Sequence, residues 1–283
     1  VAANPLGVAV SATRSEAFVA HVGANHITRI DTTNLLVLDT IPIAGISRGV
    51  ALDSTGNRLL VTRPIANNVL LVDTLSGVPG PSITVGNEPI GVAIAPNDAF
   101  AYVANRVDGT VTVVSLAPTG VVTTFAVGGS PFGVAFHPTL PRAFVANGQT
   151  GTVSVVDTGS HAVIATLNTG NSPHGVAVSA DGTRVYVANQ TGDRIEVIDP
   201  AGPTLLAPIA LPAGSQPRGI SVDAGGTRIY TANSGSNTVG VTSASPAQYL
   251  TSLPAGLFPS GFGRFIAPAA VAPGLVFRNG FEP

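Results

Sequence analysis

The chain has 283 residues, of which 45% are hydrophobic and only 10% are charged. It contains no Cys, which excludes disulfides, thiolate metal sites and cysteine nucleophiles. All 13 basic residues are Arg, which excludes a Schiff-base lysine, and the net charge of −2 leaves no excess of positive charge for nucleic-acid binding.

A repeated pattern runs along the whole chain. A Gly that opens an apolar run recurs with spacings of 42, 42, 42, 42, 44 and 42 residues, at Gly7, Gly49, Gly91, Gly133, Gly175, Gly219 and Gly261. A mostly Asn column keeps the same spacings, at His21, Arg63, Asn105, Asn147, Asn189 and Asn233. An Asp or Ser column does so too, at Asp31, Asp73, Ser115, Asp157, Asp199 and Ser243. Three columns in one register indicate an internal structural repeat.

Each repeat predicts four short strands. In the unit at 173–214, apolar or alternating runs separated by Gly, Pro and Asp-Gly turns occupy residues 175–179, 184–189, 194–199 and 205–211. No apolar run is long enough for a transmembrane helix, so the high hydrophobic content indicates strands that are covered on both faces. Four strands in about 42 residues are typical of a propeller blade.

The repeat also resembles a known family. The segment Pro173–Asn189 followed by Arg194–Asp199 is similar to the YVTN-type β-propeller repeat, and the pattern returns at 144–157 and 102–105. The resemblance covers residues 5–258. It implies an all-β propeller of four-stranded antiparallel blades, with the Gly-opened strand innermost and the Pro-x-Gly segment at one mouth of the central channel. His21 and Arg63 depart from the pattern, because they replace the Asn.

The number of blades is predicted from the number of repeats and from the residues that follow the last complete repeat. Six complete repeats are followed by a partial seventh, the Gly-opened strand at 261–266, which favours seven blades. We expect the outer strands of the closing blade to precede Val1. The predicted organisation is a propeller at 1–266 and a C-terminal extension at 267–283. That extension is interpreted as a strand that pads the last blade, or as a short ending of the kind seen on some exported bacterial proteins.

The residue before each repeat Gly is expected at the channel mouth. This column contains Arg48, His174 and Arg218, and Arg63 lies near it in the second repeat. Planar guanidinium groups suit carboxylate or phosphate, so these four residues form the candidate anion-binding site. The alternative is a solvated polar mouth with no ligand. No catalytic set, metal site or cofactor motif is predicted, since the five His lack metal-ligand spacing.

The repeated Asp and Asn columns have structural interpretations. An Asp at a strand end can accept hydrogen bonds from the turn that follows it, as in an Asx turn. We expect the Asn column to tie the following turn to the backbone in the same way.

Three functions are compatible with these observations. The first is a non-catalytic propeller that binds another protein or itself, because its few charges and regularly placed loops suit docking. The resemblance implies that such a protein is exported, to the periplasm or the cell surface. The second is an enzyme at the channel mouth, similar to lactonases, lyases or dehydrogenase heavy subunits, with His174 as general base and Arg48 and Arg218 holding an anionic substrate. The third is nucleic-acid binding, which the net charge of −2 disfavours.

Overall fold

The computed structural model describes residues 4–170, 172–256 and 259. These residues form 25 β-strands, and every strand pair within them is antiparallel. That part of the chain contains no helix long and apolar enough to cross a membrane.

The strands form six sheets in chain order. The first three sheets contain β1 (Pro5–Val10), β2 (Glu16–His21), β3 (His26–Asp31) and β4 (Val37–Pro42); β5 (Val50–Leu52), β6 (Arg58–Arg63), β7 (Asn68–Asp73) and β8 (Val78–Thr84); β9 (Pro89–Ile94), β10 (Phe100–Asn105), β11 (Thr110–Leu116) and β12 (Thr119–Ala126). The last three contain β13 (Pro131–Phe136), β14 (Arg142–Asn147), β15 (Thr152–Asp157) and β16 (Ala162–Asn168); β17 (Pro173–Val178), β18 (Val185–Asn189), β19 (Arg194–Asp199), β20 (Thr204–Leu205) and β21 (Ile209–Ala210); β22 (Pro217–Val222), β23 (Arg228–Asn233), β24 (Thr238–Ala244) and β25 (Ala247–Pro254).

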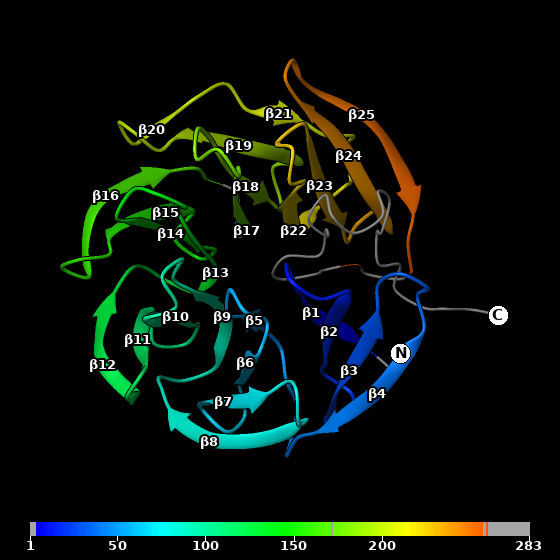
Figure 1. Cartoon of the computed structure of the whole chain (residues 1–283). Helices are drawn as coiled ribbons and strands as arrows, with labels where there is room; N and C mark the ends of the chain where they lie inside the picture. The colour runs from blue at the N-terminus through cyan, green and yellow to red at the C-terminus, as the bar shows by residue number, and fades with distance from the viewer. Residues whose placement is uncertain (1–3, 171, 257–258, 260–283) are drawn as a thin grey trace.

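The sheets are arranged as the blades of a propeller (Figure 1). The six Gly-opened strands β1, β5, β9, β13, β17 and β22 surround the central channel, and the fourth strand of each blade lies at the rim. The all-β propeller of four-stranded antiparallel blades is therefore confirmed. Blade 5 divides its outer strand into β20 and β21, which both pair with β19. Pro208 lies in the interruption and has no backbone N–H to donate to the sheet.

The ring has one join that differs from the others. Neighbouring inner strands contact each other around the ring, whereas among the described residues β22 and β1 lie farther apart (Figure 1). Tyr230 of blade 6 packs there against an apolar cluster of blade 1 that consists of Val8, Val10, Ala17, Val19 and Ile30. The described residues thus form six blades. The predicted seventh strand at 261–266 and the boundary between 266 and 267 lie outside them.

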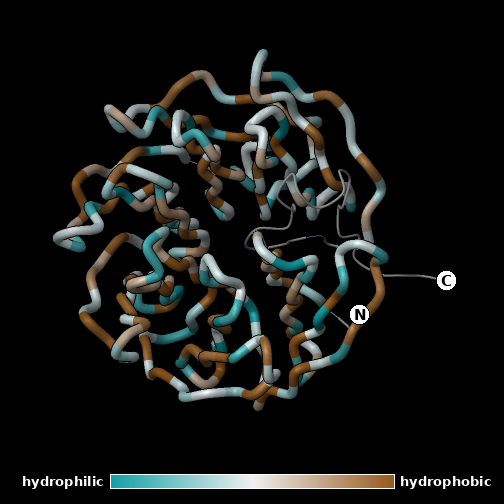
Figure 2. Tube along the Cα trace, in the orientation of Figure 1, coloured by the Kyte–Doolittle hydropathy of each residue, from teal (hydrophilic) through white to brown (hydrophobic). Residues whose placement is uncertain are grey.

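The core consists of apolar layers between blades. One layer joins Phe144 and Val153 of blade 4 to Val185 and Ile198 of blade 5, and all four side chains are fully buried. Hydrophobic residues recur along the strands of every blade (Figure 2). Blades 2 to 5 are covered on both faces by their neighbours, which explains why their strands read as nearly continuous Val, Ala and Ile.

The repeat Gly permits close contact between neighbouring inner strands. A Cβ at Gly133 would lie 2.5 Å from the carbonyl oxygen of His174, and a Cβ at Gly175 would lie 2.6 Å from that of Arg218. Real Cβ atoms do not approach backbone so closely, so any other residue would push the blades apart. The repeat Gly therefore sets how near the residues of the channel mouth lie to one another.

Candidate functional site at the upper channel mouth

The two ends of the channel differ in chemistry. We call the end where the inner strands begin the upper mouth and the end where they finish the lower mouth. Arg48, His174 and Arg218 each precede the repeat Gly of an inner strand, so they lie at the upper mouth, where the sequence places them. The loops that join the second and third strands of each blade reach the same end.

Arg48 shares a carboxylate with a second arginine. Its Nη1 lies 3.9 Å from Oε1 of Glu88, and Arg106 forms an ion pair with Oε2 of the same residue. Burial lowers the pKa of Arg48, and repulsion from Arg106 and Arg218 lowers it further, while Glu88 opposes the change. Arg48 is therefore within electrostatic range of arginines on blades 3 and 6, although 170 residues separate it from Arg218 in the sequence.

A second polar group lies on blades 5 and 6. The amide of Gln190 bridges His174 and Arg218, with its nitrogen 2.8 Å from Nε2 of His174 and its oxygen 3.0 and 3.1 Å from Nε and Nη2 of Arg218. Arg is a donor only, so the amide oxygen must face Arg218 and the nitrogen must donate to His174. Nε2 of His174 is thereby the acceptor, and the proton of the neutral ring is on Nδ1.

His174 is held neutral. It is 6% exposed and stacks on Phe132, with ring centroids 4.1 Å apart. Burial lowers the pKa of His174 to about 4, and the positive charge of Arg218 contributes to the shift. At neutral pH His174 therefore adds no positive charge to the mouth. With Nε2 engaged by Gln190, this geometry does not present the predicted general base to a substrate.

Three arginines gather at the mouth. We call Arg48, Arg106 and Arg218 the arginine cluster; among the described residues, Glu88 is the acidic side chain that forms ion pairs with it. Nε of Arg48 and Nε of Arg106 are buried without a hydrogen-bond partner in that part of the chain. The two side chains as a whole are 31% and 36% exposed, and planar guanidinium groups are suited to carboxylate recognition.

Three residues of the mouth were not expected from the sequence. Arg106 and Gln190 directly follow Asn105 and Asn189 of the repeat column, so the position after the Asn also faces the mouth. That position could have been recognised as a second mouth column from the repeat alone. Glu88 gave no comparable signal, because it becomes important only once blades 2 and 3 lie side by side.

Arg63 lies away from the cluster, within the wall of blade 2. It is 9% exposed, and its guanidinium donates to Asn68 Oδ1 at 2.8 Å, to the Ala44 carbonyl at 3.0 Å and to Ser82 Oγ at 2.7 Å. All three partners belong to the same blade or to the loop that enters it. Among the described residues, the guanidinium of Arg63 therefore joins the strands of blade 2, and it is not directed at the channel.

Arg63→Leu should destabilise the fold and leave ligand binding at the upper mouth unchanged. Loss of hydrogen bonds from a buried charged group predicts about 2 kcal/mol less free energy of unfolding. Urea denaturation measures this change. A variant with unchanged stability but weakened anion binding would instead assign Arg63 to the binding site.

The repeated Asp and Asn side chains serve different structural roles. Asp31 Oδ1 accepts a hydrogen bond from the Thr33 amide at 2.7 Å, as expected for an Asx turn. The Asn side chains do more than tie the following turn: Asn147 Nδ2 donates to Thr152 Oγ1 at 3.1 Å and Ser154 Oγ at 2.9 Å on the next strand. These residues therefore support the blade interior.

Metal binding has no support in the part of the chain that the structure describes. No group of three His, Cys, Asp or Glu side chains there could hold a metal ion.

Fold and site together define a β-propeller with a cationic upper mouth. The family model described as "Lactonase, 7-bladed beta-propeller" matches residues 123–251, from the outer strand of blade 3 to blade 6. The matched segment includes His174, Gln190 and Arg218, but not Arg48 or Arg106. It spans less than half of the 283 residues. No curated protein matches the chain.

Solved structures share the architecture widely. A chain of hydrazine synthase from Kuenenia stuttgartiensis superposes with a TM-score of 0.84 and 19% sequence identity, covering 91% of this chain and 88% of that one. In all, 1624 chains of solved structures match. A likeness this common at such low identity shows the fold and leaves function to the site.

Proposed function

We infer that this propeller is a non-catalytic binding module that binds carboxylate side chains of a partner protein at its upper mouth. The observation that carries the proposal is the arginine cluster, in which Arg48 and Arg106 share Glu88 while Arg218, within electrostatic range of Arg48, forms no ion pair among the described residues. An acidic ligand would supply the missing negative charge. The resemblance to YVTN-type propellers supports a location in the periplasm or at the cell surface.

Apolar side chains beside the cluster favour a protein partner over a small anion. Ile65 is 81% exposed and Val107 is 63% exposed, on the upper loops of blades 2 and 3. Asn87 joins these loops, because it accepts from Asn67 at 3.0 Å and donates to Asp108 at 2.8 Å. An acidic segment with flanking apolar residues would therefore meet both charge and apolar surface on one face.

The same geometry argues against catalysis. The pKa of His174 is lowered to about 4, which makes it a weak base, and its Nε2 is engaged, while the mouth carboxylate Glu88 is paired with two arginines. Neither group is placed to accept a proton from a substrate.

The family match favours a second candidate, hydrolysis of a small anionic lactone at the same mouth. His174, Gln190 and Arg218 all fall inside the matched segment. A lactone-opening assay on the purified chain, with His174→Ala alongside, tests this. Turnover that is lost in the variant would establish the enzymatic function and overturn the non-catalytic one.

A fluorescein-labelled peptide of alternating Glu and Leu tests the binding proposal. Fluorescence anisotropy should show saturable binding that weakens with added salt, since charge attraction contributes to it. Arg106→Gln should weaken binding about tenfold, which corresponds to about 1.4 kcal/mol.

The matched control is Arg184→Gln. Arg184 is exposed on the lower side of blade 5, where it donates to the Thr183 carbonyl at 2.7 Å, and its loss should leave the peptide affinity unchanged. A peptide with Gln in place of Glu should not bind. Equal affinity for the two peptides would contradict recognition of carboxylates.

A further inference from the structure

The lower part of the channel contains a cavity that the proposed function does not use. It has a volume of about 430 Å³, and residues of all six inner strands line it. This volume falls within the range of pockets that hold small organic ligands. The arginine cluster lies at the opposite end of these strands.

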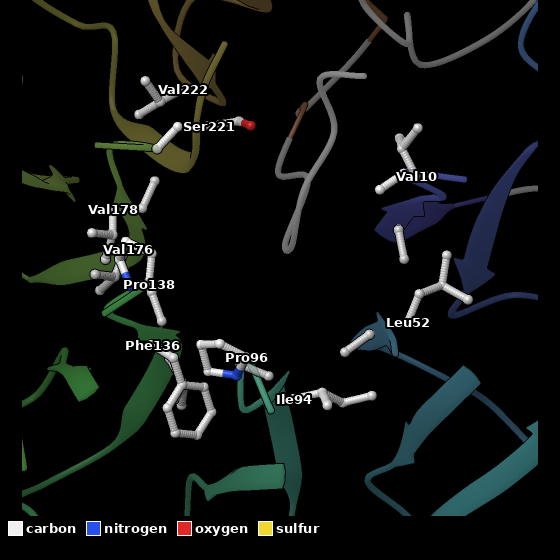
Figure 3. A pocket seen from close by; sticks show the side chains of 18 of the residues that line it. Val10, Leu52, Ile94, Pro96, Phe136, Pro138, Val176, Val178, Ser221 and Val222 are labelled. Carbon is white, nitrogen blue, oxygen red and sulfur yellow. The ribbon is translucent and has the colours of Figure 1, made fainter. Parts of the chain in front are cut away.

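The cavity wall consists of stacked tiers with one residue from each blade. The third residue after each repeat Gly forms an apolar tier, at Val10, Leu52, Ile94, Phe136, Val178 and Val222. Figure 3 shows these side chains around the cavity, with Pro96 and Pro138 nearby. These apolar side chains offer water no hydrogen-bond partner, so an apolar group that contacts them would displace water favourably.

The acidic residues at the cavity are already engaged. Asp53 accepts hydrogen bonds from the Arg58 amide at 3.1 Å and from Thr55 Oγ1 at 3.0 Å, and it pairs with the Arg58 guanidinium. Asp223 accepts from the Thr227 amide at 2.7 Å and from its hydroxyl at 2.8 Å. No basic side chain is among the described residues that line the cavity. An anionic ligand would therefore find no counter-charge there.

One tier carries a single polar exception. The second residue after the repeat Gly is Ala in five blades, at Ala9, Ala51, Ala93, Ala135 and Ala177, and is Ser221 in blade 6. Ser221 is 3% exposed and is among the residues that line the cavity (Figure 3). A buried hydroxyl in an otherwise apolar ring is a specific hydrogen-bonding point for an occupant.

We propose that the lower channel binds a neutral, largely apolar small molecule with one hydroxyl or carbonyl group, which hydrogen-bonds to Ser221. The apolar tiers supply the affinity, Ser221 fixes the orientation, and the absence of a basic side chain among the described lining residues disfavours anions. This site is independent of the carboxylate site at the upper mouth.

The probes are 1-octanol and octanoate, added to the full chain and followed by isothermal titration calorimetry. 1-Octanol should bind with a stoichiometry of one and a negative heat-capacity change, because apolar surface is buried. Octanoate should bind at least about tenfold more weakly, since its carboxylate would be buried without a partner.

Two kinds of variant test whether octanol binds in this cavity. Ser221→Ala restores the residue that the other five blades carry, so the fold should tolerate it, and octanol affinity should fall about three- to tenfold. Ala135→Leu fills the cavity and should abolish binding; Ala93→Leu on the next blade does the same if the first variant fails to fold.

The control is Val122→Ala on the rim strand β12, where the side chain is exposed, and this variant should bind octanol like the unmodified chain. The proposal is overturned if octanol shows no saturable binding, if both filling variants bind it normally, or if octanoate binds equally well.

Discussion

Gly133→Ala should lower the free energy of unfolding by about 3 kcal/mol, which corresponds to a fall in the melting temperature of roughly 6–12 °C. The added methyl would lie 2.5 Å from the carbonyl oxygen of His174 and 2.9 Å from the amide nitrogen of Val176. Both obstacles are backbone atoms of the neighbouring blade, so no side-chain rotation can relieve the overlap. Differential scanning calorimetry measures the effect.

Gly202→Ala is the matched control. Gly202 lies in the turn between β19 and β20, and no described atom lies within 4 Å of the place that its Cβ would take. Its replacement should change the stability by no more than about 0.5 kcal/mol. Equal stability of the two variants would show that the repeat Gly does not set the spacing of the blades.

Lowering the pH from 7 to 4 should destabilise the fold through His174 by about 3 kcal/mol. The pKa of His174 is about 4 in the fold, against 6.5 as its ordinary value, because of burial first and Arg218 second. Below pH 6.5 His174 is therefore protonated in the unfolded chain, whereas in the folded chain it is protonated only near pH 4 and below. Stability is unaffected by this group above pH 6.5 and falls as the pH drops through that window.

His174→Gln removes this contribution and should flatten the pH dependence between 6.5 and 4. His161 retains a smaller slope, since burial also lowers its pKa. The lowered pKa values of Asp157 and Asp181, which arise from hydrogen bonds to Ser160 and Ser179, act only in more acidic solution. Urea denaturation at several pH values measures the slope. An identical slope in the variant would mean that His174 is not the group responsible.

The arrangement of the arginines also explains why the mouth suits an anion although the whole chain has a net charge of −2. Arg48 and Arg106 converge on Glu88 from two blades, and Arg218 lies within electrostatic range of Arg48 from a third. Arginines that gather at one end of the channel attract an oppositely charged group there independently of the net charge.

Sequence by itself determined the fold, because the repeat encodes it locally. The spacing of the Gly column and the period-two runs predict blades of four short strands, and the structure has them in that order. The columns also assigned Arg48, His174 and Arg218 to one mouth, since equivalent positions of a repeat occupy equivalent places in a ring.

Only the tertiary structure decided what these residues do. Arg63 is turned into its blade by Asn68 and Ser82, and the ionisation of His174 depends on Phe132, Gln190 and Arg218 around it. The position of a residue in the repeat determines where its backbone lies in the ring. The groups that its side chain contacts come from neighbouring blades and loops. Burial and charge at the mouth depend on those partners, and therefore on how the blades pack around the channel.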